Sequence, residues 1–260
     1  MKWSDILIET STAVLRDRSN IVSGPSDELW SDEQLLRYLN DAENRFCRRG
    51  LVLRDGTTEE VISFKLKTDQ VEYPLHPSVL AVVSAKLEGD EVDLVRLGHT
   101  ILNAQRTIFP AQVYPEWAWA TPVTPGRPNG YLSDDYLVHS DGVSKVVLRF
   151  NRIPTADENG LEVRMRVCRL PLCEATVDTL DNSPEIPEDY HLDLTEWAAF
   201  RALRNHDADT EALAKASAHE ARFKKAVEEC RFDQLRKMFT PVGWGFGANG
   251  WAWPTNSGGY

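Results

Sequence analysis

The sequence of 260 residues has few of the patterns that identify enzymes. It holds no G-x-S-x-G and no G-x-x-x-x-G-K-[ST] motif, which argues against a nucleophile elbow and a P-loop. The glycines of 243–247 read G-x-G-x-G, but they follow a predicted helix and lead to no second one, so a phosphate-binding loop is not favoured. Forty acidic residues can be paired in too many ways for a carboxylate pair to indicate catalysis. We therefore expect a protein that is not an enzyme and has no cofactor.

The sequence also has few cysteines, no long apolar run and no excess of basic residues. Cys47, Cys168, Cys173 and Cys230 include no C-x-x-C pair, which predicts reduced thiols rather than a disulfide framework. The N-terminus lacks an apolar signal region, and no window approaches the roughly 20 apolar residues of a membrane span. We therefore expect synthesis and folding in the cytoplasm and no membrane partner. The net charge of −11 argues against a protein that wraps nucleic acid, although an acidic wall would let DNA slide past it.

The last twenty residues are rich in aromatic side chains where no folded core is expected. Residues 241–260 contain six glycines and two prolines, which disfavour a stable helix or a long strand. Exposed rings in such number would favour aggregation, so we expect an extended arm that lies in a groove of its own body or of a neighbour. The rings predicted to anchor this arm in a partner are Trp244, Phe246, Trp251, Trp253 and Tyr260.

Two helices are expected in the first fifty residues. The spacing of apolar residues near the N-terminus predicts a short amphipathic helix. Ser31 and Gln34 form the capping-box pattern of a second helix, with Trp30 and Leu35 at the positions of a hydrophobic staple. Gly50 is predicted to close this helix.

The apolar period changes from helical to alternating after residue 51. Strands are predicted at 61–67, 71–75, 79–87, 92–97, 145–150 and 161–170. In the last of these, Val163, Met165 and Val167 are expected to share one face. Residues 111–135, which are rich in proline and tryptophan, are expected to be irregular, and 153–160 are expected to form the turn between the last two strands.

Helical spacing returns beyond Pro184 and Pro187 and predicts a buried helix at 190–203. A long helix follows, with Leu213 and Phe223 on its buried stripe, so the two form an αα-hairpin. The sequence therefore predicts an α+β fold: a helical bundle formed by N- and C-terminal helices, with an inserted β-rich domain and an extended C-terminal arm. The predicted boundaries are 1–50 for the N-terminal helices of the bundle, 51–183 for the inserted β-rich domain, 184–240 for the C-terminal helical hairpin and 241–260 for the arm.

Three other groups of residues have both a chemical and a structural interpretation. The turn His206–Asp209 has side chains that bind metals, but an aspartate just before a helix is more often its N-cap, so we expect no metal. His191 and His219 lie on predicted helices without an H-E-x-x-H pattern, and structural roles are favoured. The Trp-Ala-Trp triplets 117–119 and 251–253 have rings that stack on sugars, although packing anchors are the favoured interpretation.

Several stretches follow one another in an order that is hard to obtain by accident. They read W-S-D-E-Q-L-L-R-Y-L-N-D-A at 30–42, G-R-P-N-G-Y at 126–131, a strand ending in proline at 146–154, a second at 161–171, and a helical hairpin over 186–200 and 206–227. Across most of residues 1–238 this order resembles the head-to-tail adaptor family of tailed bacteriophages, also described as connector or tail tubular protein A-like.

The resemblance implies a structural protein of the virion, located at the portal–tail vertex. It implies a ring of about twelve copies that docks beneath the portal and extends the DNA channel. The implied partners are the portal protein, the tail nozzle or tube protein, further copies of the chain, and DNA that passes without sequence-specific contact. The C-terminal segment is implied to reach into the portal. The alternative, based on the two tryptophan triplets, is a tail component that binds or degrades carbohydrate.

Overall fold

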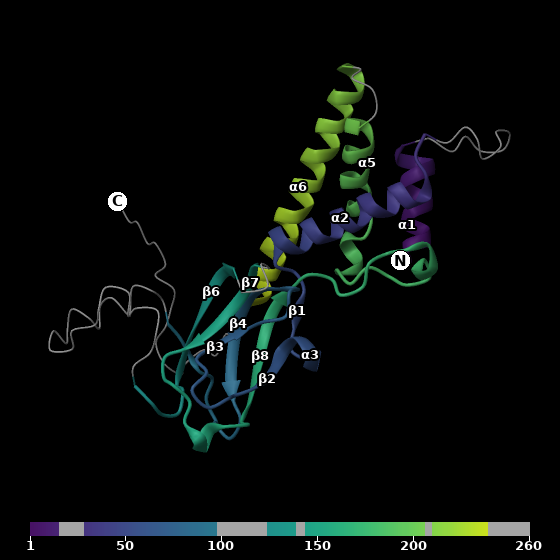
Figure 1. Cartoon of the computed structure of the whole chain (residues 1–260). Helices are drawn as coiled ribbons and strands as arrows, with labels where there is room; N and C mark the ends of the chain where they lie inside the picture. Colours follow the sequence, from purple (N-terminus) through teal and green to yellow (C-terminus); the bar gives the residue numbers. More distant parts are fainter. Residues whose placement is uncertain (16–28, 98–123, 139–143, 206–209, 239–260) are drawn as a thin grey trace, which may run out of the picture.

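The computed structural model describes residues 1–15, 29–97, 124–138, 144–205 and 210–238 (Figure 1). Helices gather at one end of the molecule and strands at the other (Figure 1). The α+β class predicted from the sequence is confirmed. The helices are α1 (Trp3–Glu9) with its π-helical continuation η1 (Thr10–Val14), α2 (Asp32–Gly50), α3 (Glu59–Ile62), α5 (Asp193–Asn205) and α6 (Thr210–Met238), and the short 3₁₀ turns are η3 (Ala156–Glu158), η4 (Val177–Thr179) and η5 (Glu188–Tyr190).

The start of α2 follows from local sequence. The Ser31 hydroxyl accepts a hydrogen bond from the Gln34 N–H, and the Gln34 side chain accepts one from the Ser31 N–H, each at 3.3 Å, which confirms the predicted capping box. The helix ends at Gly50, as predicted, although Gly50 is not the left-handed residue. Leu51, rather than Gly50, adopts the left-handed conformation, with φ of 48°. Gly50 is needed for space, because a Cβ there would lie 2.6 Å from Cγ2 of Val52.

One hydrophobic core joins helices from both ends of the chain. The ring of Phe223 on α6 packs against Phe46 of α2, with centroids 5.9 Å apart, and against Trp197 of α5, at 5.1 Å. Ala216, Phe223 and Cys230 are buried along α6. Leu213 is 44% exposed, contrary to the prediction, because it lies beyond the end of this buried seam.

The strands form two sheets that share a second core. They are β1 (Arg54–Asp55), β2 (Ser63–Lys65), β3 (Glu72–Pro74), β4 (Val79–Leu87), β5 (Val95–Arg96), β6 (Gly130–Val138), β7 (Ser144–Phe150) and β8 (Glu162–Arg169). In the first sheet β8 pairs antiparallel with β1 and β2 along one edge and with β4 along the other. The second sheet has the order β3-β7-β6-β5, with β5 parallel to β6.

The predicted alternation of β8 is confirmed, since Val163, Met165 and Val167 are buried in the core between the sheets. Cys168 is buried as well. Because β7 belongs to the second sheet and β8 to the first, residues 153–160 cross between sheets rather than close a hairpin.

Two predictions were wrong in part: the strand expected at 61–67 covers only Ser63–Lys65, and the segment 111–135, expected to be irregular, contains the start of a strand. Val61 and Ile62 belong to the helical turn α3, in which both adjacent side chains are buried, whereas neighbours in a strand face opposite sides. Residues from Gly130 form strand β6 instead of an irregular segment, because they pair with β7 and β5.

Phe223→Ala should lower the free energy of unfolding by about 3–5 kcal/mol, because it leaves a cavity between three helices. The matched control is Phe232→Ala, on the same helix but with a side chain that is 61% exposed; it should change the free energy by no more than about 0.5 kcal/mol. Urea unfolding followed by tryptophan fluorescence measures both. Equal losses would contradict the packing of α6.

Candidate functional site at the junction of helices and sheets

The aromatic residues predicted to anchor the arm lie outside the described residues and stay a prediction. The same holds for the first Trp-Ala-Trp triplet and for the turn 206–209. The outside residues are Trp117, Trp119, His206–Asp209, Trp244, Phe246, Trp251, Trp253 and Tyr260. Of the remaining candidates, His191 contacts the Ile186 carbonyl oxygen at 2.8 Å and His219 contacts Glu196 at 2.6 Å. His219 of α6 therefore ties that helix to α5, whereas His191 closes the turn η5 that precedes α5.

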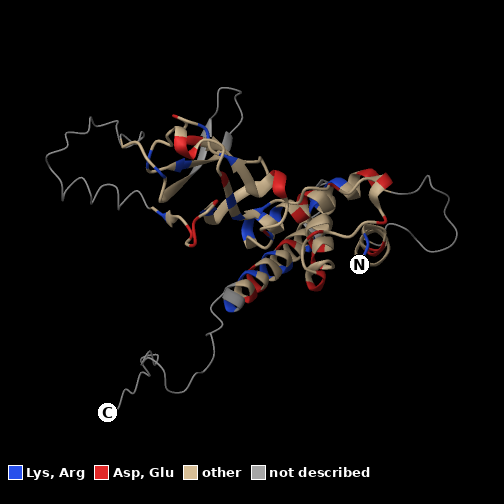
Figure 2. Cartoon of the chain, turned by 90° about the horizontal axis from the view of Figure 1, so that it is seen from below, with Lys and Arg blue, Asp and Glu red and all other residues tan. Residues whose placement is uncertain are grey.

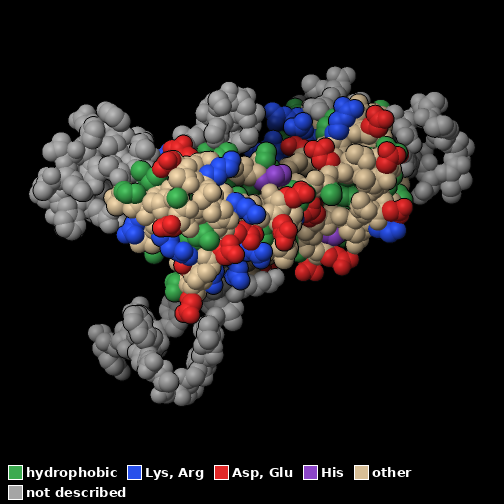
Figure 3. Space-filling view, turned by 60° about the horizontal axis from the view of Figure 1, so that its bottom comes forward, with side chains coloured by type: hydrophobic (Ala, Val, Ile, Leu, Met, Phe, Trp, Pro, Cys, Tyr) green, Lys and Arg blue, Asp and Glu red, His purple; other side chains and the backbone are tan. Residues whose placement is uncertain are grey.

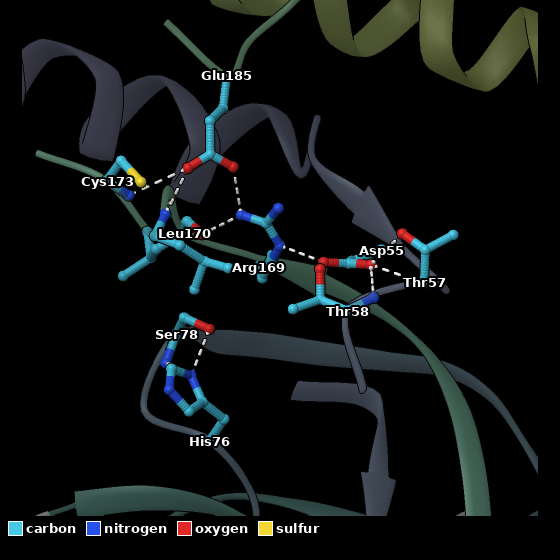
Figure 4. Close-up of polar contacts among 10 residues, drawn as sticks. Asp55, Thr57, Thr58, His76, Ser78, Arg169, Leu170, Cys173 and Glu185 are labelled. Carbon is cyan, nitrogen blue, oxygen red and sulfur yellow. Dashed lines mark hydrogen bonds and ion pairs between the residues drawn. The ribbon is translucent and has the colours of Figure 1, made fainter. Parts of the chain in front are cut away.

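The most connected polar cluster lies where the helices meet the sheets (Figure 4). Arg169, at the end of β8, donates from Nε to Oδ2 of Asp55 and from Nη1 to Oε2 of Glu185, each at 2.6 Å. The Nη1 group also donates to the Leu170 carbonyl at 3.0 Å. Because the Arg169 and Asp55 side chains are almost fully buried, these bonds act in a weakly screened environment. One guanidinium thereby links three segments of the chain.

Asp55 is held ionised by its surroundings. Its Oδ1 accepts from the Thr57 N–H at 2.9 Å and from the Thr58 N–H at 3.0 Å. Burial alone would raise the pKa of Asp55, but the two N–H groups and Arg169 outweigh it and lower the pKa well below its usual range. The carboxylate therefore keeps its charge opposite Arg169.

Glu185 connects the cluster to helix α2. Its Oε1 accepts from the Leu172 N–H at 2.6 Å, which folds the chain after β8 back on itself, while its own N–H donates to Oε1 of Glu43 at 2.7 Å. Glu43 lies on α2 and is 2% exposed. Burial raises the pKa of Glu43 to about 7, and the Glu185 carboxylate adds to this, while nearby N–H groups and Arg169 oppose it. An acid that exchanges its proton near neutral pH thus lies against the junction.

Two further contacts fix the path of the chain there. The side-chain amide of Asn40 on α2 forms a pair of 2.8 Å hydrogen bonds with the N–H and carbonyl of Ala175. At the sheet side, Leu170 donates its N–H to the Ser78 carbonyl at 2.8 Å, and the Ser78 hydroxyl contacts Nδ1 of His76 at 2.7 Å (Figure 4). The segment between β8 and α5 is therefore bound on both sides.

Sequence reasoning missed this cluster, because the partners are far apart in the chain: Arg169 and Asp55 are separated by 114 positions. Glu43 did carry a signal. It occupies a position on the apolar side of α2 between Leu39 and Cys47, both of which are buried, and a carboxyl group there needs a partner.

The chemistry of the junction is that of a structural contact. All four cysteines are free thiols, as predicted. Burial and the neighbouring Glu43 raise the pKa of Cys47, so it stays a weakly nucleophilic thiol. Within the described ranges, no His, Cys, Asp and Glu side chains are grouped to hold a metal ion. The helices of that same part of the chain are all too short or too polar to cross a membrane.

Comparison with known families decides what kind of protein carries this junction. A model of the SU10 adaptor protein family matches residues 1–244. The chain belongs to the SU10 adaptor protein family. A search of curated proteins finds no match.

Membership confirms the resemblance to phage head-to-tail adaptors. It makes this adaptor a structural component of a phage virion that associates with head and tail proteins. The match ends at Trp244, so it includes the first predicted anchor of the arm and leaves the other four beyond it.

Removing the guanidinium of Arg169 should lower the stability of the fold. Arg169→Met leaves Asp55 and Glu185 without their cation, and we expect the free energy of unfolding to fall by about 3 kcal/mol. Arg164→Met is the control, because Arg164 lies in the same strand with 65% of its side chain exposed and should cost less than about 1 kcal/mol. Chemical denaturation of both variants measures the difference; similar costs would show that Arg169 does not stabilise the junction.

The raised pKa of Glu43 predicts a pH dependence. Between the unfolded value of 4.5 and the native value of about 7, the native state holds a proton that the unfolded chain releases, so this group lowers stability as pH rises through that window. Glu43→Gln removes the effect. Its free energy of unfolding, relative to the unmodified chain, should rise from pH 4.5 to 8 by at most about 3 kcal/mol.

The control for this series is Glu33→Gln, an exposed carboxylate of the same helix, which should leave the pH profile unchanged. Denaturant unfolding at each pH gives the profiles. Parallel profiles for Glu43→Gln and the unmodified chain would contradict the raised pKa.

Proposed function

We propose that copies of this adaptor form a ring below the portal, which extends the DNA channel and joins the capsid vertex to the tail. The ring would have about twelve copies, the number that the family resemblance implies. The observation that carries the proposal is the family match over residues 1–244. The junction supports it mechanically. Because Arg169, Glu185 and Glu43 tie sheets to helices, force applied to one part is passed to the other instead of being absorbed by a flexible hinge.

The charge of the chain suits a conduit for DNA. The excess of acidic residues, −11 in total, repels phosphate groups, so DNA would pass without sequence-specific contact and without being held. The proposed role is therefore structural, with the portal, a tail nozzle or tube protein and further copies of the chain as its partners.

Residues 241–260 are proposed as the arm that inserts into the portal. Buried aromatic anchors dominate the energetics of protein interfaces, and Trp244, Phe246, Trp251 and Trp253 provide them within ten residues. The glycines between them allow the extended path that a groove requires.

Deleting residues 241–260 should weaken binding to the purified portal ring at least about tenfold, because the loss of one or two aromatic anchors costs that much. The melting temperature should change by less than about 2 °C, since the proposed role of the arm is to bind the portal and not to stabilise the fold. Binding is measured by surface plasmon resonance and confirmed by electron microscopy of the complex. A full-length chain with Thr255, Asn256 and Ser257 changed to alanine is the control. A truncated chain that docks normally would disprove the role of the arm.

A further inference from the structure

The outer face of the first sheet is basic, in a chain that is acidic as a whole. Five exposed cations occupy it: Arg54 on β1, Lys65 on β2, Lys86 on β4, and Arg164 and Arg166 on β8. We call this set the basic sheet face. The strand register confirms a common face, because Lys86 lies opposite Arg164, and Arg164 and Arg166 alternate with the buried residues of β8.

The cations of the basic sheet face are only partly neutralised. Glu162 pairs with Arg164 at 3.1 Å. This contact, with the more distant Glu59 and Glu88, raises the pKa of Arg164. Among the described residues, by contrast, Arg166 and Lys65 have no ion-pair partner. Like charges placed directly opposite in a sheet destabilise it. A surface that costs stability in the monomer is typical of a binding site.

A complementary surface lies in the segment that the junction holds in place. From Leu170 to Phe200 the sequence has eight acidic residues and no lysine or arginine. We call residues 172–189, most of which are exposed, the acidic linker. Lys2 and the N-terminal amine pair with Asp181 and Glu188, whereas in the described part of the chain Glu174, Asp178 and Asp189 have no cationic partner.

The acidic linker is a formed surface rather than a loose chain. Asn40 holds Ala175 through two hydrogen bonds, and the hydroxyl of Thr179 accepts from the Thr176 N–H at 2.8 Å, which closes the turn η4. The carboxylates of Glu174 and Asp178 are thereby presented beside the apolar side chain of Val177, which is 56% exposed. Such a surface is complementary to lysine and arginine side chains. Their charged ends can pair with the carboxylates, while their aliphatic stems can pack on the apolar residue.

Helix α6 carries charges that neutralise one another. On the exposed side of α6 both signs alternate (Figure 2), and Lys224 pairs with Glu220 and Lys225 with Glu229. In the view of Figure 3, acidic side chains predominate over the helical half, while lysine and arginine are spread across the sheet half. The basic sheet face and the acidic linker therefore differ from the exposed side of α6, where charges of both signs pair.

We propose that the basic sheet face binds the acidic linker of a second copy of this chain. Both surfaces are exposed within one copy, so neither satisfies the other internally. A contact between two different surfaces repeats from copy to copy, which is the geometry that closes a ring. The inference rests on the proposed function, since it names the surfaces through which the copies of the ring meet.

The test is a charge exchange in the full chain. The face variant carries Lys86→Glu and Arg166→Glu, and the linker variant carries Glu174→Lys and Asp178→Lys. In a solution of either variant alone, the sheet face and the linker of neighbouring copies carry charges of the same sign. Self-association should therefore weaken at least tenfold. A mixture of the two variants should recover it, because each reversed surface then meets a complementary one, and so should a chain that carries all four substitutions. Sedimentation velocity at low and moderate salt, without and with the purified portal, measures association; circular dichroism checks folding.

The control is Lys225→Glu on α6, which should associate like the unmodified chain. The proposal is overturned if the face and linker variants associate normally, if neither the mixture nor the fourfold variant recovers association, or if the unmodified chain does not self-associate even on the portal. If the charge exchange does not restore association but the unmodified chain still binds the portal, only the proposed contact between these two surfaces is contradicted. Failure of the unmodified chain to bind the portal contradicts the proposed function itself.

Discussion

The bridge that Arg169 makes between Asp55 and Glu185 determines how the rest of the molecule is joined. A buried cation is stable only when its charge and its hydrogen-bond donors are matched, and here each carboxylate also accepts backbone N–H groups, from Thr57 and Thr58 on one side and Leu172 on the other. Turning the helices relative to the sheets would separate at least one of these pairs and leave a charge buried alone. The two hydrophobic cores are separate clusters of residues, and this bridge is a polar link between them.

Glu43 shows that the polar connection between helices and sheets lowers the stability of the fold. Its carboxyl group accepts the Glu185 N–H deep against α2, where a charged form is poorly solvated, so the proton is retained to about pH 7. An apolar residue would fit the surrounding core better but would leave that N–H without an acceptor. Stability is given up for one defined path of the chain between β8 and α5.

The parts of the fold that sequence predicts are those with local causes. The capping box of Ser31 and the alternation of Val163, Met165 and Val167 need only nearby residues. Strand β6 depends on pairing with β7 and β5, and the junction depends on ion pairs across most of the chain, so neither has a local pattern. Glu43 is intermediate: its position on an apolar helix face indicated a buried acid, but only the fold shows that the linker is its partner.

The same contacts that join the two cores also decide which charges reach the surface. Because Asn40 and Glu43 hold Ala175 and Glu185 against α2, the carboxylates between them have to face outward, and no lysine or arginine of that segment can neutralise them. On β8, the alternation that buries valine and methionine in the core leaves Arg164 and Arg166 on the opposite face. The charge asymmetry is thus a consequence of the internal packing. In a ring, identical copies meet with the same relative orientation, so an asymmetry fixed inside each copy becomes a directional contact between copies.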